Sequence, residues 1–332
     1  MSRHPSPRPD PPPPLASMTA RCPEDLLAFV PVALGFVPQQ SVVLLTFGAG
    51  PSFHARVDLP SHESDVPFVI EALVDPCLRH DVERVVIVLY AAAPSLVRDL
   101  ADRLERALTR EGIEVLELMC ADGRRWFPML PGRADQPRGV PYDVSAHPFA
   151  AEAVVAGLVT HSSRDALAAT LWPDPVAVAT VSDVLGGVSP ADAGWVRALT
   201  HRHAGRGTVP EPADLARLLV SIADPVAREG AWCAIERADA REHVALWTCV
   251  LRSAPERLVA GPAAVLGFAA WLAGHGALAW CAVERALEAD GSCSLADTVS
   301  GLLVSAVPPS RWRPPGPPPP GGAAAHASGG AA

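Results

Sequence analysis

Residues 22–47 read CPEDLLAFVPVALGFVPQQSVVLLTF, and this stretch decides the fold. Its first part predicts a helix, because Pro23 suits a first helical position and apolar residues follow at helical spacing. Gly35 ends the helix, since glycine readily adopts the left-handed conformation that follows a helix C-terminus. Pro31 lies inside the pattern, so we expect a kink or two short helical pieces.

Three strands follow from the hydrophobic pattern. Residues 41–47 are apolar without alternation, which predicts a central strand covered on both faces. Residues 53–59 alternate in polarity and predict a half-buried strand that forms a hairpin with the first. Residues 84–90 predict a second fully buried strand. We expect 42–45 and 85–89 to lie side by side in the sheet.

Helices alternate with these strands. Residues 62–79 and 94–110 predict amphipathic helices, and 113–121 predict a strand. Asp122-Gly123 suits a two-residue hairpin turn into a further strand at 124–129. Strands that alternate with helices, together with antiparallel hairpins, predict an α/β sandwich with a mixed sheet.

Beyond residue 148 the sequence predicts only helices, arranged as an all-α domain of antiparallel pairs. Residues 263–291 approach the tetratricopeptide pattern, with Leu266-Gly267 at its Leu-Gly positions and Ala279 and Ala286 at its two Ala positions. Small residues are needed where paired helices touch, so we expect tetratricopeptide-like packing. The predicted helices lie at about 148–160, 163–171, 190–202, 212–223, 225–238, 240–252, 262–273, 277–289 and 294–305.

The sequence predicts that the chain divides into four segments. We predict a disordered Pro-rich arm at 1–20, an α/β domain at 21–148, a helical domain at 149–307 and a disordered Pro/Gly/Ala tail at 308–332.

Composition excludes several functional classes. The chain holds 27 Lys+Arg residues and every one is Arg, which excludes P-loop enzymes, protein kinases and pyridoxal-phosphate enzymes because each needs a lysine. The net charge of −9 argues against a nucleic-acid partner. The 7 cysteines form no C-x-x-C pair and no disulfide framework, and no signal peptide is apparent, so we predict a cytoplasmic protein.

Motifs for a membrane span, a cofactor or a metal are weak. Residues 258–283 carry no formal charge, but Pro262 and the Gly274-His275-Gly276 triplet divide them, so we predict two globular helices and no membrane partner. We predict no cofactor, since the G-x-G at 48–50 precedes a strand instead of a helix.

His201 and His203 form an H-x-H motif, and the carboxylates of Asp192 and Glu211 are near enough in the sequence to complete a set of metal ligands. Arg197, Arg202 and Arg206 surround it, however, and oppose a cation, so we predict no metal site and no catalytic constellation.

A ligand site at the sheet edge is the alternative that the sequence leaves open. Directly after Asp122-Gly123, two arginines precede Trp126. Such a group can bind a carboxylate or a phosphate through the arginines and can stack on a ring. The Pro-rich loop that follows supplies a hydroxyl and an imidazole. The candidate ligand-binding residues are Arg56, Asp58, Asp122, Arg124, Arg125, Trp126, Tyr142 and His147.

The stretches PEDLLAFVPVALGFVPQQSVVLLTF, ARVDLP, RVVIVLY, DGRRWF and AAWLAGHGALAWCAVERALEAD resemble an actinobacterial family, domain of unknown function 4192. The resemblance extends from about Cys22 to Trp312 and implies no established activity.

The sequence favours a non-enzymatic protein-binding or scaffolding module. Its helical half holds Trp residues that are enriched at interfaces. The alternative is a small-molecule-binding protein or a hydrolytic enzyme at the edge near Arg124, Trp126, Tyr142 and His147. Neither the partner nor the oligomeric state follows from the sequence.

Overall fold

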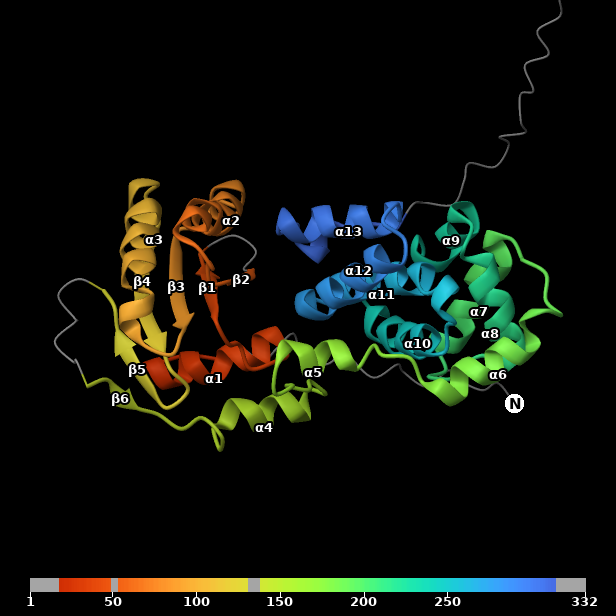
Figure 1. Ribbon diagram of the computed structural model, residues 1–332, viewed down its shortest axis with the longest axis horizontal. Helices are drawn as coiled ribbons and strands as arrows, with labels where there is room; N and C mark the ends of the chain where they lie inside the picture. Colours follow the sequence, from red (N-terminus) through yellow and green to blue (C-terminus); the bar gives the residue numbers. More distant parts are fainter. Residues whose placement is uncertain (1–17, 49–52, 131–137, 315–332) are drawn as a thin grey trace, which may run out of the picture.

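A computed structural model describes residues 18–48, 53–130 and 138–314. Most of the predicted arm and tail, part of the glycine turn after the first strand and part of the Pro-rich loop lie outside the described residues. The described chain forms an α/β half and a helical half side by side, with helices α4 and α5 passing between them (Figure 1).

The α/β half contains a six-stranded mixed sheet with the strand order β2-β1-β3-β4-β5-β6. Strand β1 pairs antiparallel with both β2 and β3, and β3 pairs parallel with β4. The β1–β2 hairpin and the neighbouring buried strands β1 and β3 are confirmed. The strands are β1 (Ser41–Phe47), β2 (His54–Asp58), β3 (Arg84–Tyr90), β4 (Glu114–Ala121), β5 (Arg125–Pro128) and β6 (Val140–Pro141).

The opening helix α1 (Pro23–Leu34) is a single continuous element. Of the two predicted alternatives, two short pieces are wrong: Pro31 has no N–H and so removes one internal hydrogen bond in the last turn, and the helix continues to Leu34. Gly35 has a φ of 77° and its N–H donates to the Pro31 carbonyl, which confirms the predicted left-handed helix end.

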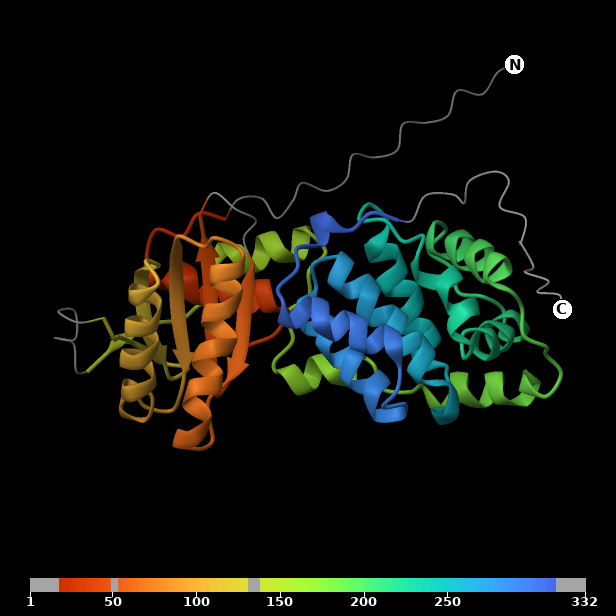
Figure 2. The same cartoon turned by 90° about the horizontal axis from the view of Figure 1, so that it is seen from above.

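Two helices cover one face of the sheet and α1 crosses the other. Helices α2 (Val66–Arg79) and α3 (Arg98–Arg110) lie on the side opposite α1 (Figure 2). Their face contains the larger hydrophobic cluster, whereas α1 supplies three buried residues, Leu26, Leu27 and Val30, to a smaller one. The sheet is therefore covered less completely on the α1 face.

The described chain beyond residue 148 is helical, as predicted, apart from one bridge at His161. The sequence assigns no element to residues 172–189, where the structure has α6, and the helix predicted at 225–238 ends at Trp232. The helices are α4 (Pro148–Val155), α5 (Arg164–Ala169), α6 (Pro175–Leu185), α7 (Ala193–Ala204), α8 (Pro212–Ser221), α9 (Pro225–Trp232), α10 (Ala240–Arg252), α11 (Ala260–Leu272), α12 (Gly276–Ala289) and α13 (Ser294–Val304).

Helices α11 and α12 form the antiparallel pair predicted from the tetratricopeptide-like pattern. A Cβ atom on Gly267 would lie 3.1 Å from a methyl group of Val283 and 3.5 Å from the Ala279 carbonyl oxygen, so the small residue permits the close approach. In the described part of the chain, no helix has the length and apolar character needed to cross a membrane.

Candidate binding site

The eight predicted ligand-binding residues do not share one edge of the sheet. Arg56 and Asp58 lie on β2, at one end of the strand order, whereas Arg125 and Trp126 lie on β5 toward the other end. Three strands separate the two groups. The single pocket expected from the sequence is therefore not assembled from all eight residues.

Arg56 and Asp58 lie where the α/β half meets the helical half. The Arg56 guanidinium is 2.6 Å from the Asp58 carboxylate and lies 5.9 Å from the centre of the Phe36 ring. Phe36 itself packs in the hydrophobic core of the helical half. This geometry gives Arg56 and Asp58 a role at the junction between the halves.

The turn before β5 is held by its own carboxylate. Asp122 Oδ1 accepts the backbone N–H groups of Arg124 and Arg125, at 2.8 and 2.7 Å. The Arg125 guanidinium donates to the carbonyl oxygens of Arg138 and Gly139. Three of the predicted site residues thus stabilise the β5–β6 edge.

Trp126 and His147 fix the N-terminal turn of α1 to that edge. The Trp126 indole donates to Glu24 at 3.0 Å, and His147 Nε2 lies 3.1 Å from Asp25 Oδ1. Tyr142 packs against the same core, and desolvation raises the pKa of its hydroxyl. The structure brings these three predicted residues to α1, where the polar atoms of Trp126 and His147 position the start of that helix.

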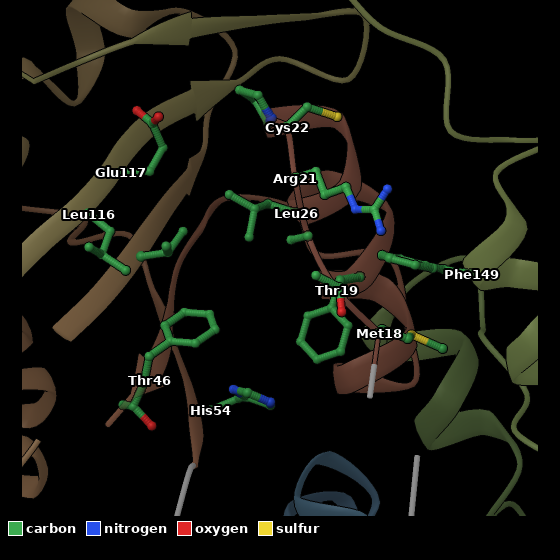
Figure 3. Close-up of a pocket in the computed structure, with 15 residues that line it drawn as sticks. Met18, Thr19, Arg21, Cys22, Leu26, Thr46, His54, Leu116, Glu117 and Phe149 are labelled. Carbon is green, nitrogen blue, oxygen red and sulfur yellow. The ribbon is translucent and has the colours of Figure 1, made fainter. Parts of the chain in front are cut away.

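A cavity of about 690 Å³ lies between α1 and the incompletely covered sheet face. One wall is formed by the segment before α1, by α1 itself and by Phe149 of α4, and the other is formed by strands (Figure 3). Apolar side chains contribute most of the lining. The lining residues are Met18, Thr19, Ala20, Arg21, Cys22, Pro23, Leu26, Phe29, Thr46, Phe47, His54, Val86, Leu116, Glu117 and Phe149.

A β-bulge shapes the strand wall. Val85 pairs with Val115 and Val86 pairs with Glu117, so Leu116 is an extra residue opposite β3. A bulge redirects side chains that would otherwise alternate between faces. Leu116 and Glu117 consequently both line the cavity, one apolar and one acidic (Figure 3).

The remaining polar groups of the cavity have defined surroundings. Thr46 is engaged with the backbone of Phe53 through both its hydroxyl donor and its acceptor. The His54 ring meets the Phe29 ring edge to face, with centroids 5.4 Å apart. Desolvation lowers the pKa of His54, so the ring is neutral at pH 7 although part of it is open to solvent.

Cys22 lines the cavity and carries a thiol, which is a potential nucleophile. Its environment, however, does not activate the thiol. A backbone hydrogen bond involving Asp25 lowers the pKa of the thiol, whereas desolvation and the carboxyl groups of Asp25 and Glu24 raise it. The net effect is a raised pKa, so the thiol stays protonated at neutral pH. The cavity therefore has the chemistry of a binding site more than that of a covalent catalyst.

Sequence reasoning missed the cavity because it depends on how much of a sheet face one helix covers. The available signal was in residues 114–117, where Glu114, Val115, Leu116 and Glu117 interrupt the alternation expected of a strand. Among the described residues, the group of three metal-ligating side chains close enough to share an ion lies elsewhere, at His201, Asp239 and His243 in the helical half.

A mixed sheet with a cavity on one face, followed by paired helices, defines a two-part α/β and all-α protein. The chain belongs to the family described as Domain of unknown function (DUF4192), which matches residues 23–310. This assignment confirms the family resemblance noted in the sequence. Comparison with curated proteins and with solved structures finds no match.

Proposed function

We propose that this chain is a non-enzymatic binding protein whose α/β half takes a small, largely apolar molecule between α1 and the sheet. The cavity itself carries the proposal. Its volume of about 690 Å³ lies within the range of about 300–1,000 Å³ typical of ligand sites, and its lining is mostly apolar with a few polar groups. Arg21 and Glu117 would orient a polar end of the ligand.

The contacts of the predicted edge residues favour binding over hydrolysis. The His147 ring contacts Asp25 through one nitrogen and accepts the Phe149 N–H at the other. Desolvation raises the pKa of the Tyr142 hydroxyl, which makes it a poorer nucleophile precursor at neutral pH. His147 therefore supports the start of α1, and Tyr142 packs beside it in the smaller hydrophobic cluster. A cytoplasmic location stays a prediction, which the seven free cysteines support.

The fluorescent probe 8-anilinonaphthalene-1-sulfonate tests the cavity, because its aromatic rings are apolar, its sulfonate supplies a polar end, and its fluorescence rises away from water. Leu116→Trp places a larger ring in the cavity at a partly exposed position, and we expect probe affinity to fall by about tenfold, equivalent to about 1.4 kcal/mol. Leu96→Trp is the control, since Leu96 is 70% exposed and does not line the cavity.

Titrations at fixed protein concentration, with thermal melting of each variant, provide the measurement. Loss of probe binding in Leu116→Trp alone, with an unchanged melting temperature, supports the proposal. Equal probe binding by the wild type and both variants would contradict it, as would a wild type that binds no probe.

Protein binding is the second candidate, and exposed apolar side chains along α4–α6 favour it. Monomeric soluble proteins rarely expose many large apolar residues together. Here five of them, 63% to 90% exposed, lie between α4 and the start of α6: Val154, Val155, Val159, Trp172 and Val176.

Cross-linking followed by affinity purification, with a charged double variant, tests this surface. A partner captured by the wild type but lost with Val155→Asp/Val176→Asp supports protein binding. Val226→Asp is the matched control, because Val226 is 69% exposed on α9, outside α4–α6. Capture that is equal for all three proteins, or absent for all three, contradicts this candidate.

A further inference from the structure

Two histidines and a carboxylate meet between helices α7 and α10 of the helical half. His201 lies in α7, Asp239 precedes α10, and His243 lies in the first turn of α10. Asp239 Oδ2 is 4.0 Å from His201 Nδ1 and 4.0 Å from His243 Nε2. One ligand atom from each residue lies within 4.8 Å of the other two.

His243 is the unusual member of this cluster. Its side chain is only 1% exposed, and neither ring nitrogen has a hydrogen-bond partner among the described residues. A buried polar group without a partner costs stability, so such groups require an explanation. A bond from Nε2 to an ion would satisfy one of the two nitrogens.

The carboxylate is oriented toward the rings by a backbone contact. Asp239 Oδ1 accepts the N–H of Glu236 at 2.9 Å, which leaves Oδ2 as the atom nearest both imidazoles. Outer hydrogen bonds of this kind fix ligand orientation in metal sites. The two rings meet edge to face, with centroids 5.4 Å apart.

We propose that His201, Asp239 and His243 together bind one divalent transition-metal ion, with Zn²⁺ as the best-suited ion. Two imidazoles and one carboxylate are a ligand set typical of zinc, and water would supply a fourth ligand. His201 and Asp239 are 39% and 36% exposed, so the site has access to solvent. The protein atoms need to close by about 1 Å to reach tetrahedral spacing around Zn–N bonds of about 2.0–2.1 Å.

This site differs from the H-x-H motif and from its proposed partners in the sequence. His203 Nδ1 pairs with the Thr208 hydroxyl at 2.9 Å, and Asp192 caps α7 by accepting the Trp195 N–H. The arginines expected to oppose a cation, Arg197, Arg202 and Arg206, are all exposed to solvent. The ion would join α7 to the start of α10, independently of the cavity in the α/β half.

Calorimetric titration of the metal-stripped full-length protein with ZnCl₂ tests the proposal. We expect one Zn²⁺ per chain. His201→Gln and Asp239→Asn, both at partly exposed positions, are expected to weaken binding by at least about 100-fold, since even loss of an outer contact costs 10- to 100-fold. His203→Gln is the matched control and is expected to bind Zn²⁺ as the wild type does.

Co²⁺ absorption distinguishes this site from the free thiols. Visible bands without a near-ultraviolet thiolate band, lost in both ligand variants, support the proposal. Zn²⁺ binding that is unchanged in His201→Gln and Asp239→Asn, or a thiolate band as the main Co²⁺ signal, would overturn it. The absence of Zn²⁺ binding to a folded wild type would overturn it as well.

Discussion

Both halves of this protein have apolar cores, but the helical core is rich in Ala whereas the sheet core consists mostly of Val and Leu, and the two cores pack differently. In the helical half, α11 is buried on every side from Gly261 to Leu272, because small residues let the neighbouring helices approach closely. In the α/β half, a cavity of about 690 Å³ remains beside a sheet face crossed by α1. Close packing therefore depends on how many elements converge on a surface as much as on their composition.

The strongest test of this contrast is a methyl group placed at the tightest contact of the helical half. A Cβ on Gly230 of α9 would overlap the carbonyl oxygen of Ala193 in α7. We expect Gly230→Ala to lower the free energy of unfolding by about 3 kcal/mol, because the clash is with backbone that cannot rotate away.

Urea denaturation measures this loss, with Gly301→Ala of α13 as the matched control. A Cβ on Gly301 meets nothing within 4 Å, and alanine is the better helix former, so we expect a gain of up to about 1 kcal/mol. Equal stability of the two variants would show that α9 and α7 can separate without cost.

Leucine truncation compares the two halves directly. Leu266 in α11 is fully buried, so Leu266→Ala should cost about 2–5 kcal/mol through lost burial and an unfilled space. Leu116→Ala enlarges an existing cavity at a residue that is 37% exposed and should cost less than about 1 kcal/mol. Urea denaturation of both variants measures the loss of unfolding free energy. An equal loss in Leu266→Ala and Leu116→Ala would contradict the contrast in packing.

The smallest expected effect concerns the attachment of α1 and depends on pH. The Arg21 N–H donates to Asp25 at 2.6 Å, and this contact, together with the hydrogen bond to His147, holds the pKa of the Asp25 carboxyl below its usual range. The stabilisation is therefore present above the unfolded pKa, near 4, and is lost as the pH falls through the lower folded value.

Thermal melting of wild type and Asp25→Asn between pH 2 and pH 7 measures this effect. We expect the wild type to be more stable by less than about 1 kcal/mol at pH 7, with the difference vanishing at the acid end. Asp183→Asn, at an exposed carboxyl on α6, is the control. A difference that does not change with pH would contradict the assignment to the Asp25 charge.

Local sequence pattern predicted the strands and most helices, because burial on two faces leaves a continuous apolar run and helical spacing leaves a clear period. Helix α6 was missed because its valines and threonine favour strands, although Asp174 and Pro175 form an ordinary helix start. The candidate site was harder to predict. The order of strands separates Arg56 from Arg125, and no local spacing specifies which edge a strand occupies.

The metal ligands illustrate the same limit. His243 follows Asp239 by one helical turn, a signal visible in the sequence, but the contact with His201 depends on how α7 packs against α10. The H-x-H spacing drew attention to His203 instead, and the surrounding arginines led to the prediction of no metal site. The His203 ring is engaged with Thr208, five residues along the chain.

Phe36 links the loop after α1 to the hydrophobic core of the helical half. Its backbone neighbours exchange hydrogen bonds with His161: the Val37 N–H donates to the His161 carbonyl, and the His161 N–H donates to Gly35. Its ring is 2% exposed within the helical core. A fragment that stops at residue 148 would leave that ring in water, so the two halves cannot be exchanged between proteins as independent modules.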